Sequence, residues 1–127
     1  MNESTRLRTH PHERFAATEH AFNVQEAVTK LRAESRPTQH GHRQITLFHQ
    51  APVTMVLFDF EAGGELREHQ ANGLVCIQCF EGHITVATPE HSHDLVGGTM
   101  VLLRPNVRHS VRAAEASAML LTVHLKN

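Results

Sequence analysis

Eight short segments of β-type sequence, separated by turn residues, fill the chain from residue 44 to residue 124. Turn pairs separate them, as at Gly63-Gly64, Gly97-Gly98 and Pro105-Asn106. Strands of this length and spacing, with no helical pattern between them, form antiparallel sandwiches or barrels. The pattern therefore predicts an all-β domain. The segments are Gln44 to Phe48, Val53 to Phe60, Leu74 to Phe80, His83 to Thr88, Asp94 to Val96, Met100 to Leu103, Ser110 to Ala113 and Ala118 to His124.

The part of the chain before these strands divides in two. Residues 1–20 are polar and without periodicity, which predicts a flexible N-terminal arm. Residues 21–127 are expected to form a single domain, with a barrel from about residue 44 to 125. A helix is expected over about 23–35, because Asn23 and Glu26 have the spacing of a capping box. Its apolar stripe would pack on the domain and comprises Val24, Ala27, Val28 and Leu31.

The charge balance bears on the kind of partner the chain can have. Lys and Arg number 12 and Asp and Glu number 13, giving a formal net charge of −1, and the charges form no long run. Nucleic acid and anionic membranes attract concentrated positive charge, so neither is expected as a partner. The sequence also lacks an apolar run long enough to cross a membrane and a secretion-signal pattern at its start. We therefore expect a cytoplasmic protein.

The two cysteines, Cys76 and Cys79, have C-x-x-C spacing inside one predicted strand. Residues three apart in a strand point to opposite faces, with Cα atoms about 10 Å apart. A disulfide needs roughly 4.4 to 6.8 Å between Cα atoms. Two unlinked thiols are therefore expected, at least one of them packed in the core.

Two stretches carry the most specific motif residues. The first contains Gly64, His69 and, farther along, Gly82. The second begins at Gly98, passes a turn at Pro105 and ends at His109. This order and spacing resemble the two sequence boxes of the cupin superfamily.

In that family the first box has Gly, five residues later His-x-His, then Glu with Gly seven positions on; the second box supplies a further histidine. The resemblance implies a small RmlC-like cupin, whose fold is a double-stranded β-helix, or jelly-roll barrel, and whose four ligand positions face into the barrel. Here two of those positions hold His69 and His109. The second histidine position is Ala71 and the glutamate position is Val75. The resemblance therefore implies an incomplete ligand set.

Alternation along the strand places Val75, Ile77 and Cys79 on the inward face. With His69 and His109 they are expected to line the ligand site. If a metal binds, a third donor is needed, because zinc takes three or four protein ligands and iron oxygenases take two histidines and a carboxylate. The metal would be a divalent Zn, Ni, Fe or Mn. The sequence offers Cys79 and His124 as the main candidates for the third donor, and His49 on an early strand as another.

An acid–base role without metal is a further reading of the histidine pair, because burial would keep both imidazoles neutral. Epimerase-type cupins pair a histidine with a tyrosine and with basic residues that hold a sugar nucleotide. This chain has no tyrosine, and its sequence shows no evident arginine cluster. The His-x-His pairs at residues 10–12, 40–42 and 91–93 are expected on solvated loops.

Three functional hypotheses remain open at the level of sequence. The preferred one is a barrel that binds a small molecule through His69 and His109, with no certain cofactor. The alternatives are a mononuclear metal-dependent dioxygenase or isomerase, and a non-catalytic regulatory or interaction module. A homodimer is expected in each case, because pairing protects exposed sheet edges.

Overall fold

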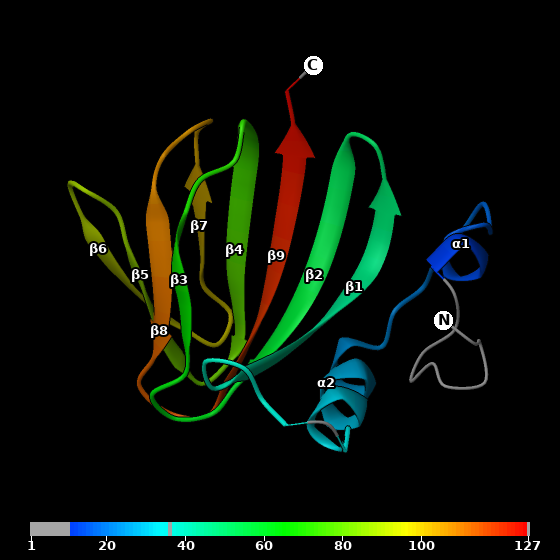
Figure 1. The fold of residues 1–127 in the computed structure, drawn as a ribbon, viewed down its shortest axis with the longest axis horizontal. Helices are drawn as coiled ribbons and strands as arrows, with labels where there is room; N and C mark the ends of the chain where they lie inside the picture. Colours follow the sequence, from blue (N-terminus) through cyan, green and yellow to red (C-terminus); the bar gives the residue numbers. More distant parts are fainter. Residues whose placement is uncertain (1–10, 36, 127) are drawn as a thin grey trace.

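The computed structural model describes residues 11–35 and 37–126, which form two short helices and nine strands (Figure 1). The elements are α1 Pro11–Arg14, α2 Val24–Arg32, β1 His42–Gln50, β2 Val53–Phe60, β3 Glu65–His69, β4 Gly73–Glu81, β5 His83–Ala87, β6 Ser92–Val96, β7 Met100–Leu103, β8 His109–Ala113 and β9 Ser117–Leu125. The all-β prediction is confirmed, and each of the eight predicted segments corresponds to a strand.

The strands form two antiparallel sheets that face each other (Figure 1). One sheet has the order β1-β2-β9-β4-β7 and the other the order β3-β8-β5-β6. Strands that follow one another in sequence cross repeatedly between the sheets, as in a jelly roll. The ninth strand, β3, was missed because Leu66 is its only apolar residue, so period-2 alternation is absent.

The core lies between the two sheets and follows the alternation of each strand. From Gly73 to Phe80 in β4 the residues at odd positions are buried and those at even positions are exposed or half-buried. The predicted inward face is therefore confirmed, and Cys76 and Cys79 are unlinked, as expected. The buried core residues are Phe58, Phe60, Val75, Ile77, Cys79, Ile84, Val86, Leu95, Leu103, Val111, Ala113, Met119 and Leu121.

Helix α2 covers the outer face of the larger sheet on the side of β1 and β2 (Figure 1). Its cap is as predicted: the side-chain oxygen of Asn23 accepts a hydrogen bond of 2.9 Å from the backbone N–H of Glu26. Val28 and Leu31 are buried against Leu57 and Ala118. The helix has nine residues, and no helix in the described part of the chain is long and apolar enough to span a membrane.

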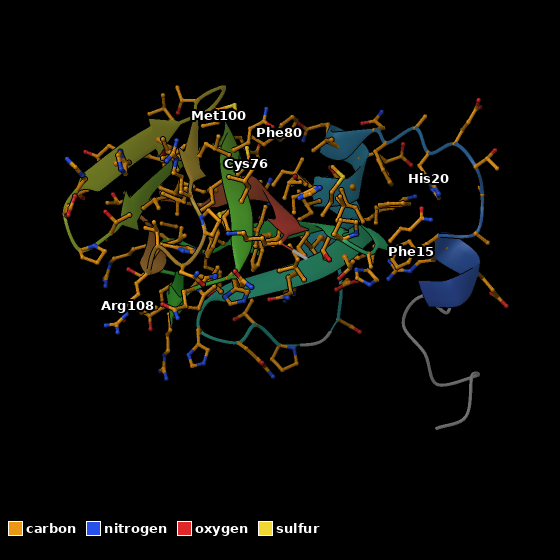
Figure 2. The ribbon with its side chains drawn as sticks, turned by 90° about the horizontal axis from the view of Figure 1, so that it is seen from above. Phe15, His20, Cys76, Phe80, Met100 and Arg108 are labelled. Atoms are coloured by element: carbon orange, nitrogen blue, oxygen red, sulfur yellow. The ribbon has the colours of Figure 1, made fainter. Side chains whose placement is uncertain are left out.

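The segment before α2 contacts β1. The guanidinium of Arg14 donates to the carbonyl of Thr46 at 2.9 Å, and the rings of Phe15 and His20 both pack on Phe48. Figure 2 shows Phe15 and His20 beside the strands at this side of the molecule. Residues 1–10 lie outside the described residues, so for them a flexible arm stays a prediction.

An ion pair ties α2 to the sheet below it. The Nε of Arg32 donates to Asp59 at 2.7 Å, and its terminal nitrogen also pairs with Glu81. Asp59 is only 6% exposed, and burial raises the pKa of its carboxyl although Arg32 acts in the opposite direction. The guanidinium thus offsets the cost of a buried carboxylate.

We expect Arg32→Ala to lower the free energy of unfolding by about 1–3 kcal/mol, because Asp59 would be left buried without its main partner. Lys30→Ala removes a cation from the same helix whose partner, Glu26, is exposed. That change should cost no more than about 0.5 kcal/mol. Urea unfolding of both variants measures the difference, and equal losses would contradict the role given to Asp59.

Candidate functional site

The imidazoles of His69 and His109 meet at one end of the barrel. The two residues are partners in the β3–β8 pairing, at the last residue of β3 and the first of β8. Their ring centroids lie 4.1 Å apart, and the rings are inclined at 61°. His109 is 1% exposed, whereas His69 is half-buried. A register shift between Leu66 and His69 brings the second ring opposite the first.

Each ring is oriented by a backbone carbonyl two residues before it in the chain. The Nδ1 of His109 lies 3.0 Å from the carbonyl of Val107, and the Nδ1 of His69 lies 2.9 Å from the carbonyl of Arg67. A carbonyl can only accept, so each Nδ1 carries a proton and donates. In the neutral ring the Nε2 is then an acceptor with a free lone pair. The Nε2 of His109 is buried and has no hydrogen-bond partner among the described residues.

The surroundings of His109 favour its neutral form. Burial lowers the pKa of its imidazole below the usual value, and the neighbouring His69 lowers it further. The hydrogen bond to Val107 acts in the opposite direction but does not reverse the shift. At neutral pH the buried Nε2 is therefore unprotonated.

The lowered pKa predicts that acid destabilises the fold. An unfolded histidine titrates near pH 6.5. Below that pH the unfolded chain takes up a proton at His109 that the folded chain does not, so stability falls as the pH approaches the folded pKa. We expect His109→Asn to reduce the loss of unfolding free energy between about pH 7.5 and 5.5. His124→Asn, on the exposed outer face, controls for removing any histidine, and equal effects of the two variants would contradict the prediction.

Val75 and Ile77 line the barrel interior as predicted, with exposed fractions of 2% and 0%. Val75 pairs with Leu103 on one side and Val123 on the other, and all three belong to or pack against the core cluster. The position that would hold a glutamate in the resembled family is thus an apolar wall. Ala71 is also packed against this cluster.

Cys79 faces inward but lies at the opposite end of β4 from the histidines. Strand β4 starts at Gly73, close to His69 in the chain, and Cys79 is six residues farther along. Its thiol lies 3.5 Å from the carbonyl of Glu81, the last residue of β4. The structure therefore does not bring Cys79 to the pair, because alternation determines the face of a residue but not its level along the barrel.

His124 does not join the pair either. Along β9, Met119 and Leu121 face the core, whereas Ala118 packs under α2 on the outer face. His124 shares the parity of Ala118 and is exposed. Its partners in the neighbouring strands are Val53 and Leu74.

The described residues contain no group of three or more His, Cys, Asp or Glu that could hold a metal ion. His69 and His109 supply two nitrogens where metal sites of this type use at least three protein donors. The residues present in the described ranges therefore do not fit the metal centre that the resemblance implies.

A cavity of about 540 Å³ lies at the same end of the molecule, and sequence reasoning missed it. It is bounded by the β5–β6 turn and the β7–β8 loop; the turn follows Ala87, which pairs with Ser110 next to His109. We call it the rim cavity. Its lining residues are Thr88, Pro89, Glu90, His91, His93, Leu102, Leu103, Arg104, Asn106, Val107 and Arg108.

The expectation of a solvated loop at residues 91–93 was wrong for His93. His93 lies within β6 and is half-buried, whereas the 91–93 pair was expected on a solvated loop. Arg104 and Arg108 were not recognised as a cluster, yet both line the rim cavity with His91 and His93. The His-x-His spacing at residues 91–93 was the sequence signal for this cavity. It was not sufficient, because the approach of the β5–β6 turn to the β7–β8 loop depends on how the two sheets pack.

No protein-family model matches the chain, and no curated protein matches it in sequence. Solved structures do match in fold. An RmlC-like cupin from Shewanella frigidimarina has 19% identity and a TM-score of 0.68, covering 87% of this chain and 94% of its own. A cupin superfamily protein from Desulfitobacterium hafniense has 19% identity and a TM-score of 0.67, with 73% and 84% covered.

A salicylate 1,2-dioxygenase from Pseudoaminobacter salicylatoxidans, solved as adducts with gentisate, has 18% identity and a TM-score of 0.64. The match covers 80% of this chain and 31% of the dioxygenase. Likeness at these identities establishes the fold alone, since one fold hosts many functions.

Proposed function

We propose that this chain, which has the cupin fold, binds a small molecule at the end of its barrel through the imidazoles of His69 and His109. The observation that supports this most directly is the buried Nε2 of His109, which has no partner among the described residues. A buried polar atom without a hydrogen bond lowers the stability of the fold. The presence of such an atom at His109 therefore favours a ligand that bonds to it. A ligand that donates to this atom would remove the cost.

The tautomers restrict the chemistry of such a ligand. Both Nδ1 atoms are used by backbone carbonyls, so the ligand meets the Nε2 atoms of His69 and His109. An unprotonated Nε2 accepts a hydrogen bond, which favours hydroxyl, amine or amide N–H groups on the ligand. The wall at Val75 and Ile77 is apolar and suits a compact body with few polar groups. The same lone pair would serve as a general base if the protein is an enzyme.

A thermal-shift screen of chelator-treated protein against small hydroxy and amino compounds tests the proposal. We expect stabilising compounds whose affinity falls at least about tenfold in His69→Leu, which removes a half-buried acceptor. His49→Leu, at the exposed end of β1, is the matched control and should leave affinity unchanged. No stabilising compound, or equal affinity in both variants, would refute the proposal.

We further propose that the protein forms a homodimer through an apolar patch on the outer face of the larger sheet. The patch comprises Leu74, Phe80, Met100 and Leu102 together with the half-buried Cys76. Figure 2 shows Met100, Phe80 and Cys76 along one side of the molecule. Helix α2 covers the part of this face formed by β1 and β2, whereas the part formed by β4 and β7 has no covering helix among the described residues.

A second copy is the favoured partner because the patch includes an edge strand. Strand β7 ends the order of its sheet, and Met100 and Leu102 on it are 56% and 60% exposed. An exposed edge strand with apolar side chains can pair with the same strand of a second copy, because its backbone groups are unpaired. Pairing of two identical surfaces gives a closed two-fold dimer.

Leu102→Glu should therefore weaken the dimer by at least about tenfold, because it would bury a charge in an apolar interface. Light scattering coupled to size-exclusion chromatography measures the dissociation. Val96→Glu, which adds the same charge at a 51% exposed apolar position of β6, should leave the dimer intact. A monomeric wild type at high micromolar concentration would refute the interface.

A further inference from the structure

We propose that the rim cavity is a binding site for a small organic anion, a molecule with a carboxylate or phosphate group attached to an apolar body. The cavity borders the histidine pair, since Val107 lines it and also accepts the hydrogen bond from His109. The inference nevertheless rests on different residues from those of the proposed function.

Hydrogen bonds fix the walls of the rim cavity. In the β5–β6 turn, the backbone N–H of Thr88 donates to the carbonyl of His91 at 2.8 Å, and the hydroxyl of Thr88 accepts from the N–H of His91 at 3.1 Å. In the facing loop, the N–H of Asn106 donates to the carbonyl of Ala71 at 2.8 Å. Asn106 has φ of 66°, a left-handed conformation that asparagine tolerates. The cavity is thus bounded by two tied loops, which limits the cost of ordering them around a ligand.

The charged residues of the lining favour an anion. Arg104 and Arg108 both line the cavity, and neither guanidinium has an ion-pair or hydrogen-bond partner within residues 11–35 and 37–126. Glu90 is the acidic residue of the lining, so cations outnumber anions there. Arg108 lies at the margin of the molecule (Figure 2) and is exposed. Guanidinium groups match carboxylate and phosphate oxygens in geometry and charge.

Uncharged lining residues favour an organic ligand over a bare inorganic ion. Leu103 is buried and Val107 is packed against the core, and both line the cavity, so they give it an apolar side. The side chains of Asn106, His91 and His93 can hydrogen-bond to further polar groups. A volume of about 540 Å³ lies within the range of small-molecule sites.

Three probes that share a phenyl ring test the charge requirement: benzoate, phenyl phosphate and benzamide, which is the neutral counterpart of benzoate. Each is titrated to about 10 mM into the 15N-labelled full chain while amide shifts are followed by NMR. We expect at least one of the two anions to shift the amides of Thr88, His91 and Asn106 saturably, with benzamide at least about tenfold weaker. The stronger anion identifies the head group.

The arginine variants then locate the contact. Arg104→Gln and Arg108→Gln should each lower the affinity for the tighter-binding anion, since each removes a charge-assisted hydrogen bond. The double variant should lower that affinity by at least about tenfold. Arg112→Gln, an exposed arginine on β8 outside the cavity lining, should leave binding unchanged. The amide spectrum shows directly whether each variant is folded.

The absence of saturable shifts with either anion would overturn the anion site, as would equal binding of benzamide or full affinity in the double variant. A fourth variant, His69→Leu, separates this inference from the proposed function. Anion binding that survives His69→Leu but not the arginine changes supports the rim cavity even if the histidine pair binds nothing.

Discussion

Gly82→Ala should lower the free energy of unfolding by about 3–5 kcal/mol, a large part of the stability of a domain this size. Gly82 joins β4 to β5 with φ of 89°, which L side chains rarely adopt. A methyl group there would also meet the hydroxyl of Ser117 and the carbonyl of Ala116 far inside normal contact. Ser117 cannot move aside, because its hydroxyl accepts from the N–H of His83 and donates to the carbonyl of Glu115 at 2.7 Å.

Gly98→Ala is the matched control for this change. Gly98 has nearly the same φ, 91°, but a methyl group there would meet no heavy atom within 4 Å. We expect a loss of about 1–2 kcal/mol, which is the backbone strain alone. Guanidinium unfolding measures both variants, and equal losses would show that the contact with Ser117 is not limiting. A larger loss of unfolding free energy in Gly82→Ala than in Gly98→Ala would mean that the turn itself requires Gly82. Gly82 belongs to the cupin-like spacing, and this requirement would hold whatever the barrel binds.

Val75→Glu should lower the free energy of unfolding by about 3–5 kcal/mol, an effect similar in size to that of Gly82→Ala. Val75 is 2% exposed and pairs with Leu103 and Val123, so the new carboxyl group would enter an apolar wall without a donor. The group would be held largely in its protonated form, because burial disfavours the carboxylate. Unfolding in urea at neutral pH measures the loss. Leu74→Glu, at the exposed neighbouring position, should cost far less.

Zinc should reverse that loss in the double variant Ala71→His/Val75→Glu, which fills the two positions left blank relative to the resembled family. At a free zinc concentration of about 1,000 times Kd, binding would return about 4 kcal/mol. Adding His109→Asn to the double variant should abolish the recovery, because it removes an original donor. An equal zinc-dependent stabilisation of the wild type would contradict our view that its own set is incomplete.

The sequence predicted the parts of the fold that depend on local signals. Asn23 was identified as a helix cap because a capping side chain bonds a backbone group three residues away, and alternation in β4 correctly placed Val75 and Ile77 inside. Strand β3 was missed because an edge strand with a register shift needs few apolar residues. Its Glu65 and Arg67 carry no period-2 pattern.

The candidate site was predictable only in part. His69 and His109 were paired correctly because the motif spacing reflects the register of two strands. The sequence alone could not rule out Cys79 as a third donor. Alternation predicts that it faces inward, but the structure shows that its thiol lies beside Glu81, at the far end of β4. The rim cavity was missed because Arg104 directly follows β7 and His93 lies in β6, and these two strands belong to different sheets. Only the packing of the two sheets against each other brings the two loops together.

The central claim is that His109 is a neutral imidazole whose Nε2 is free to accept from a ligand. A long-range 1H–15N correlation spectrum of the histidine rings, recorded at about pH 7 before and after treatment with a chelator, tests it most directly. We predict a neutral His109 ring with the proton on Nδ1, an unprotonated Nε2, and identical signals in both spectra. A proton on Nε2, a doubly protonated ring, or a shift of the His69 and His109 signals on chelation would contradict the claim.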